Sequence, residues 1–272
     1  MNFRYIHLYS DFTVRNLNLN IVARDIGEIF SNCTVDIRIP FLQYATKSIS
    51  VNWLAEELAS LQILDTSQPY NSQPEIGSRS DRNSVLFEKY LITNPYHTSR
   101  GLYDGFMMQR LYETLLPENE KTIDNIHIIL DSRLTCTFSE DDHRYHARAI
   151  ICGTPSIIST SGIIEAPAKP KDFYLRQIGW MPTAADIEDL KKQFAGKYID
   201  YDDHRINSII TGYIIQALFF FLTDGNPFCS DAGCRLFNAH WQEDLISTQV
   251  NNKRICKRDL VLLDKFLKEY LI

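Results

Sequence analysis

The sequence predicts an α/β protein with a mixed sheet and flanking helices, and the order of its first three segments is the main reason. Residues 3–10, "FRYIHLYS", are strand-like, and residues 33–39, "CTVDIRI", alternate apolar and polar side chains with a period of two. Between them, residues 19–30 place Val22 and Ile26 at helical spacing. A strand, a helix and a strand in succession favour an α/β layer.

The elements predicted beyond this unit continue the mixture of strands and helices. Residues 125–138 read as a mostly buried strand region, and residues 206–222 form the most apolar helix, which the sequence Asp224-Gly225-Asn226-Pro227 ends. Further elements are predicted as helices at 50–63 with Ser50 as the cap, at 103–116, at 183–196 and at 257–271, and as two apolar strands within 145–167, separated by Gly153-Thr154-Pro155.

One polar segment divides the chain. Residues 65–84 are rich in proline, serine and asparagine, which is typical of a flexible connector. It separates an α/β segment at 1–64 from the rest of the chain at 85–272, and we expect the two to form one compact unit.

Composition narrows the class of protein. The chain has 272 residues, 44% of them hydrophobic, which allows a substantial core. Its formal net charge of -6 argues against nucleic acid as the main partner, because such binding needs a basic face. The apolar run at 213–222 is shorter than the roughly 20 residues that cross a membrane, and the N-terminus reads as a strand rather than a signal peptide. We therefore expect a cytoplasmic protein without a membrane partner.

A metal-like pattern follows the apolar helix. Cys229 and Cys234 flank a glycine-containing loop, and His240 comes six residues after the second cysteine. Thiolate and imidazole ligands suit zinc, and Cys256 is a candidate fourth ligand, with Asp231 or Glu243 as other choices. The alternative is a set of reduced, packed cysteines with His240 bonded to the backbone, since buried free cysteine behaves as a small apolar residue.

Other histidines and acids offer weaker candidates. Glu140, Asp142, His143 and His146 lie close together in the sequence, where a solvated turn that leads into a strand is the simpler interpretation. His204 follows a run of acids that we expect to cap the apolar helix. These residues, together with Asp131 and His240, would form a relocated active site if they lined one pocket.

The motifs of several enzyme classes are missing from the sequence. It contains no glycine-rich phosphate loop and no GxSxG nucleophile elbow, so neither nucleotide binding nor serine hydrolysis has support. The HExxH motif of zinc peptidases is also missing.

Despite this, the order of "IHIILDSRL", "HARAIICGTPSIISTSGIIEAPAKP", an apolar helix and a cysteine pair resembles the archaemetzincin branch of the zinc metallopeptidases. The sequence is most similar to a prokaryotic, largely archaeal, group of metallopeptidase-like proteins, and this similarity covers most of the chain. The stretches "CRLFNAHWQE" and "SIISTSGIIEAPAKP" are its specific part. The similarity to archaemetzincins themselves is remote and limited to the C-terminal half, for which it implies a zincin-like fold.

The resemblance also implies which residues stand at the family's catalytic positions. Archaemetzincins carry HExxHxxGxxHC, four further residues, a second cysteine and a methionine. Aligning the cysteine pair with Cys229 and Cys234 places the family's glycine on Gly225. The same alignment places apolar residues on the three histidines, the glutamate and the methionine: Leu218, Leu222, Phe228, Phe219 and Leu236.

These substitutions define the functional hypotheses. A zincin needs three protein ligands around zinc and a carboxylate that takes a proton from the metal-bound water. The resemblance therefore implies a metallopeptidase-like protein without zincin hydrolysis, which keeps a structural zinc ion and binds a peptide or protein in its cleft. The alternatives are an active metal-dependent hydrolase with the relocated site, or an interaction module that docks through residues 65–84.

Overall fold

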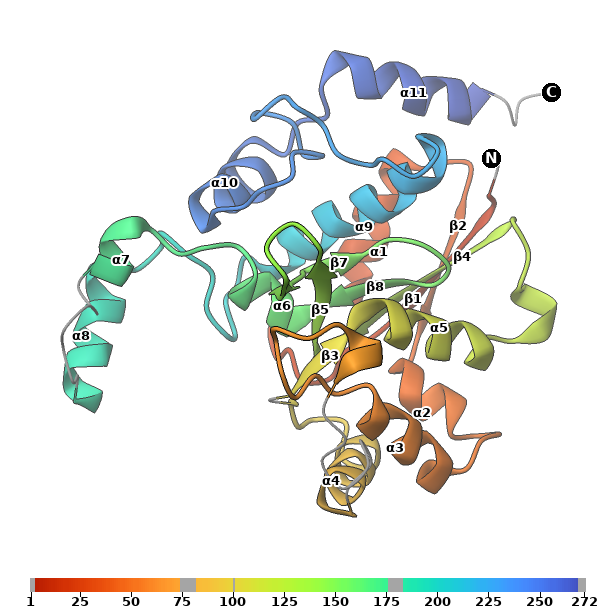
Figure 1. The fold of residues 1–272 in the computed structure, drawn as a ribbon. Helices are drawn as coiled ribbons and strands as arrows, with labels where there is room; N and C mark the ends of the chain where they lie inside the picture. The colour runs from red at the N-terminus through yellow and green to blue at the C-terminus, as the bar shows by residue number, and fades with distance from the viewer. Residues whose placement is uncertain (1–2, 74–81, 100, 176–182, 269–272) are drawn as a thin grey trace.

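The structure, a computed structural model, describes residues 3–73, 82–99, 101–175 and 183–268. Its main sheet has five strands in the order β2-β1-β4-β8-β7 (Figure 1). The first four are parallel, and β7 pairs antiparallel with β8 at one edge. The strands are β1 (Tyr5–Tyr9), β2 (Thr34–Arg38), β4 (Asn125–Asp131), β7 (Ile150–Ile151) and β8 (Ser156–Ser159).

A second sheet of three strands is built from the middle of the chain. Its order is β3-β5-β6, with β3 parallel and β6 antiparallel to β5. The strands are β3 (Leu102–Asp104), β5 (Leu134–Ser139) and β6 (Arg144–Ala147). Two mixed sheets with flanking helices confirm the predicted α/β class.

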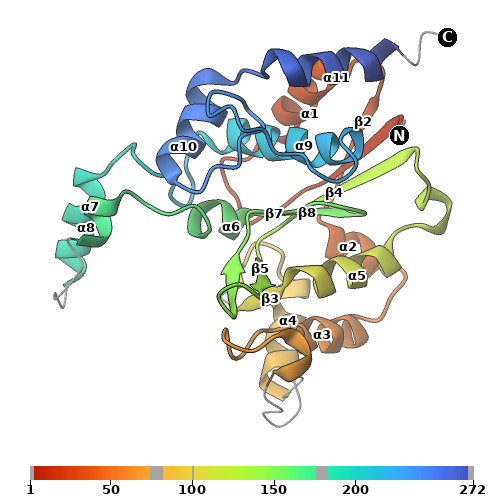
Figure 2. The same ribbon diagram turned by 45° about the horizontal axis from the view of Figure 1, so that its top comes forward.

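Helices cover both faces of the main sheet (Figures 1 and 2). On one face lie α1 (Leu19–Ile29), α9 (Ile206–Leu222), α10 (Gln242–Ile246) and α11 (Lys257–Lys268). On the other lie α2 (Phe41–Ala45), α3 (Val51–Ser60), α4 (Arg82–Thr93) and α5 (Gly105–Leu115). The short helical turns are η1 (Tyr70–Ser72), η2 (Glu118–Glu120) and η3 (Ser247–Asn252).

Alternation along the strands divides the core into two parts. Ile6 and Leu8 of β1 pack with α1 and α9, whereas Tyr9 packs with α2 and α5. Successive side chains of a strand point to opposite faces, so one strand contributes to both cores. This explains why β1 and β4 place apolar side chains on both faces, with His7 and His127 as polar exceptions on the second face.

Helix α9 is the central helix of the first core. Twelve of its 17 residues are buried, so no polar stripe marks a solvent face. It ends as predicted: the N–H of Gly225 donates to the carbonyl oxygen of Phe220 at 2.9 Å, and Gly225 has a φ of 97°. Glycine adopts this left-handed conformation without a Cβ clash, which makes it the usual residue at a helix end. None of the described helices is long and apolar enough to cross a membrane.

The prediction of a second apolar strand within 145–167 is wrong for the later half of that strand. Only Ser156–Ser159 is a strand, and α6 (Thr160–Glu165) follows at once. The Ser159 hydroxyl accepts a hydrogen bond from the N–H of Gly162 at 2.8 Å and so caps the helix.

After α6 the chain leaves the body in an arm that is visible in both views (Figures 1 and 2). The arm carries α7 (Lys171–Leu175) and α8 (Ala184–Gln193), and it has its own small apolar cluster, which includes Phe173 and Phe194. Within the predicted connector at 65–84, residues 74–81 lie outside the described residues, and α4 begins at Arg82.

Candidate functional site

Three cysteines and one aspartate meet in the first core. Cys229 and Cys234 lie in the loop after α9, Cys256 precedes α11, and Asp259 lies in the first turn of α11. One ligand atom from each of the four residues lies within 4.8 Å of the others, and all four residues are buried. The Sγ atoms of Cys229 and Cys256 are 3.8 Å apart, and Asp259 Oδ2 lies 3.1 Å from Cys256 Sγ.

These distances fit a tetrahedral ion. With zinc–sulfur bonds of about 2.3 Å, two sulfur ligands at tetrahedral corners are about 3.8 Å apart. A disulfide would need about 2.05 Å instead, so Cys229 and Cys256 are reduced, as are the other cysteines. Three thiols and one carboxylate form a donor set that suits zinc.

Burial raises the pKa of the Cys229 and Cys234 thiols, and backbone N–H groups oppose this effect only in part. The N–H groups of Leu236 and Cys256 point at Cys234 Sγ at 3.5 and 3.4 Å. Arg258 binds the outer oxygen of Asp259 at 2.8 Å, which leaves Oδ2 toward the sulfur atoms. Burial works to raise the pKa of Asp259, but the hydrogen bonds from Arg258 and the thiols outweigh it and lower that pKa.

The structure brings together three of the four metal ligands that the sequence suggested. His240 is exposed and stands outside this group, and Asp231 pairs with Arg254 at 2.8 Å. Asp259 takes the remaining position, which the sequence reading missed. The available signal was the spacing Cys256-x-x-Asp259 at a helix start, because residues three apart share a helix face.

A second group of possible ligands comes from neighbouring strands and η2: His7, His127 and Glu120. Both ring nitrogens of His7 already face oxygen atoms, Asp36 Oδ2 at 3.0 Å and Asn125 Oδ1 at 2.8 Å. Both oxygens of Glu120 accept from Arg38, at 2.7 and 2.8 Å. With these lone pairs engaged and a guanidinium beside them, we interpret the group as a polar network rather than a cation site.

An open cleft of about 480 Å³ lies beside the edge strand β7. Its walls come from the segment 147–152, from helix α9, from the loop 225–228 and from the segment 237–240. Tyr213, Gln216 and Phe220 are the residues of α9 that line it. Among the residues described there, Arg148 and His240 carry the ionisable nitrogen atoms, and no carboxylate is present.

The helix positions that the resemblance assigned to catalysis face elsewhere. Leu218 and Phe219 are fully buried in the first core, and the Phe219 ring lies 6.4 Å from that of Phe30 on α1. Of the carried-over positions, Gly225 and Phe228 do line the cleft. The expected zincin-like geometry of the C-terminal half is therefore not confirmed.

The candidates for a relocated site lie on separate elements. Glu140, Asp142 and His143 are exposed at the turn between β5 and β6, where His146 Nε2 lies 2.9 Å from Asp142. His204 is exposed before α9. Helix α9 starts at Ile206, and its N-cap residue Arg205 makes no side-chain cap hydrogen bond; of the acids expected to cap it, Asp203 accepts from the N–H of Arg205 at 2.9 Å. Over the described part of the chain, none of these residues belongs to a group of three possible ligands.

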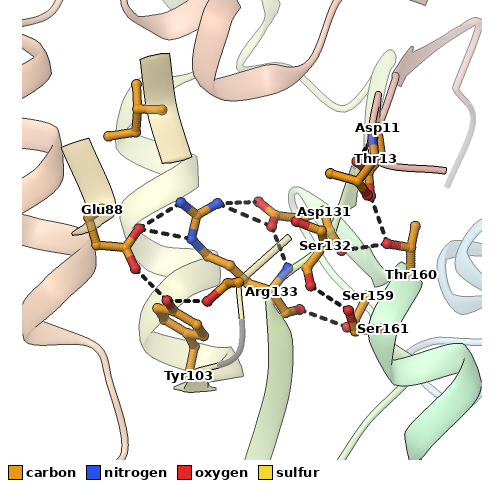
Figure 3. Close-up of polar contacts among 12 residues, drawn as sticks. Asp11, Thr13, Glu88, Tyr103, Asp131, Ser132, Arg133, Ser159, Thr160 and Ser161 are labelled. Atoms are coloured by element: carbon orange, nitrogen blue, oxygen red, sulfur yellow. Dashed lines mark hydrogen bonds and ion pairs between the residues drawn. The ribbon is translucent and has the colours of Figure 1, made fainter. Parts of the chain in front are cut away.

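Asp131 instead belongs to a buried polar network at the carboxyl ends of β1, β4 and β8 (Figure 3). Arg133 joins Asp131 to Glu88 of α4, with 2.7 Å between Arg133 Nη2 and Glu88 Oε2. Asp11 accepts from the N–H of Thr13 and from the hydroxyl of Thr160, at 2.9 and 2.7 Å. The labelled members are Asp11, Thr13, Glu88, Tyr103, Asp131, Ser132, Arg133, Ser159, Thr160 and Ser161.

This location is where α/β sheets commonly bind ligands. Here, however, each oxygen of the three carboxylates already accepts a hydrogen bond from a protein group. Buried and fully satisfied networks of this kind fix a structure. We therefore interpret the network as the link between α4 and the sheet.

The fold and these sites define an α/β protein with a buried cysteine–aspartate centre beside an open cleft. The chain belongs to the family described as "Probable metallopeptidase family (DUF6775)", which matches residues 2–266. No curated protein and no solved structure matches the chain significantly.

Proposed function

We propose that this member of the metallopeptidase family binds peptides in the cleft beside β7 without zincin hydrolysis, and holds one structural zinc ion. The observation that carries the proposal is the lining of the cleft. Among its described residues, His240 is the only histidine and no acid is present. Three ligands for a catalytic ion and a carboxylate base are what zincin chemistry requires.

The structural ion belongs to the cysteine–aspartate centre. Cys229, Cys234, Cys256 and Asp259 would hold zinc with four protein donors and no open position, as structural sites do. Such an ion ties the loop after α9 to the start of α11, so its binding free energy adds to folding.

The position of the cleft supports a peptide as the ligand. Strand β7 is the edge of the five-stranded sheet, and its residues Ile150 and Ile151 line the cleft. An extended peptide can add to such an edge through main-chain hydrogen bonds, with pockets that select its side chains. None of the six cysteines forms a disulfide, which fits a reducing compartment, and on this basis we place the protein in the cytoplasm.

The test combines binding and cleavage. Fluorescein-labelled unstructured peptides are titrated with the purified protein by fluorescence anisotropy, and the same mixtures are analysed for cleavage by mass spectrometry. We expect saturable binding without cleavage. Phe228→Ala, which removes a cleft ring, should weaken binding, whereas Phe87→Ala on α4 should not. Cleavage that a chelator abolishes would contradict the proposal.

A further inference from the structure

Arg148 brings an uncompensated positive charge into the cleft. It lies between β6 and β7, and its Nε donates to Thr137 Oγ1 at 2.7 Å, which fixes the plane of the guanidinium. Both residues line the cleft. Across the part of the chain that the structure describes, no acid lies within ion-pair distance of Arg148.

The other residues that line the cleft do not neutralise this positive charge. The described lining contains no aspartate or glutamate, although the protein as a whole has a formal net charge of -6. A guanidinium presents a planar fork of donors that matches a carboxylate, and a fixed fork gives up little conformational freedom on binding. The ligand group that fits Arg148 is therefore an anion with two oxygen atoms, such as a carboxylate.

The side chains near Arg148 in the cleft indicate two further chemical groups that the ligand should carry. Phe106 and Phe228 are 56% and 36% exposed on the cleft wall and offer contact to an apolar group. Gln216 also lines the cleft, and its buried Oε1 has no hydrogen-bond partner within the described structure, so we expect it to accept from a ligand N–H once the side chain turns toward the cleft. A carboxylate, an apolar side chain and an N–H group occur together at the C-terminal end of a peptide.

We propose that the cleft recognises the free C-terminal carboxylate of a peptide whose last side chain is apolar, and that Arg148 determines this specificity. The proposal rests on the peptide-binding function proposed above and names its ligand. An internal peptide segment offers Arg148 neutral carbonyl oxygens, and a carboxylate only where it carries an acidic side chain, whereas every free C-terminus carries one. Recognition of a chain end gives the guanidinium its partner.

The test uses one N-acetylated, alanine-rich pentapeptide that ends in leucine, made as the free acid and as the C-terminal amide. Dissociation constants are measured by isothermal titration calorimetry with the full-length protein. We expect the amide to bind at least about 10-fold more weakly, because it loses a charge-assisted pair of hydrogen bonds. Arg148→Met should weaken binding of the acid to the level of the amide, and Arg148→Lys should lie between.

Arg144→Met is the matched control. Arg144 lies four residues before Arg148, at the start of β6, is exposed and pairs with Asp142 outside the cleft, so the acid should keep its advantage in this variant. Equal binding of acid and amide to the natural protein would overturn the carboxylate assignment and leave the peptide cleft in place. Binding of neither peptide would overturn the peptide cleft and the assignment together.

Discussion

The buried ion pairs of Arg133 give the sharpest prediction about stability. The Arg133 side chain is 5% exposed and donates to Glu88, which is fully buried, and to Asp131. Burial lowers the pKa of Arg133, but the charges of Glu88 and Asp131 outweigh it and hold that pKa well above its usual value. The guanidinium is therefore a fixed charge that compensates two buried carboxylates.

Arg133→Met keeps most of the side-chain volume and removes this compensation. Leaving buried charges without a partner typically lowers the free energy of unfolding by about 3–5 kcal/mol. Urea unfolding, followed by the fluorescence of the three tryptophans, measures the loss. Adding Glu88→Gln should recover part of it, because one uncompensated charge is then removed.

Arg24→Met is the control, since the Arg24 side chain is 64% exposed and pairs only on the surface. Its effect should stay within about 0.5 kcal/mol. A loss below about 1 kcal/mol for Arg133→Met would refute the view that this network fixes α4 to the sheet.

Two further predictions concern packing and pH. Gly162→Ala should destabilise the protein, because the added Cβ would collide with the carbonyl oxygen of Arg148. Gly27→Ala in α1 has open space around its Cβ and should stabilise the protein by up to about 1 kcal/mol. Equal effects of the two substitutions in urea unfolding would contradict this prediction. Burial lowers the pKa of His127 to about 4. As the pH falls, the His127 imidazole therefore gains a proton in the unfolded chain before it does so in the folded protein. The free energy of unfolding should therefore fall by about 3 kcal/mol between pH 6.5 and 4, and a His127→Gln variant with the same pH dependence would disprove this cause.

The sequence was most informative where local rules decide the structure. Strand β2 and helix α1 are found where the alternation and the helical spacing predicted them, although burial along β2 does not alternate and Ile37 is 40% exposed. Ser50 caps α3 as expected, with its hydroxyl 3.5 Å from the N–H of Trp53. Alternation and capping depend on neighbours along the chain, so they can be read without tertiary structure.

Helix α6 shows where such rules fail. The sequence around it is rich in isoleucine and threonine, which favour strands. Residues 160–165 form a helix because the Ser159 hydroxyl caps its start and because Gly162, which has no Cβ, lets the helix lie close to the backbone of Arg148. The second of these causes is a tertiary contact, which no pattern in the sequence contains.

The site was predictable only in part for a similar reason. Cysteines that follow an apolar helix are a recognisable signal, and Cys229, Cys234 and Cys256 do meet. Asp259 joins them because of how α11 packs. Helix α9 is apolar almost all round, so its pattern could not show that the face with Gln216 lines the cleft while Leu218 lies in the core.

The zinc content of the untagged protein tests the central claim, the structural metal centre, most directly. Inductively coupled plasma mass spectrometry should find one zinc ion per chain, lost in Cys229→Ser and kept in Cys33→Ser, because Cys33 lies outside the cysteine–aspartate group. A protein without zinc, a second ion per chain, or a Cys229→Ser variant that keeps its zinc would contradict the account.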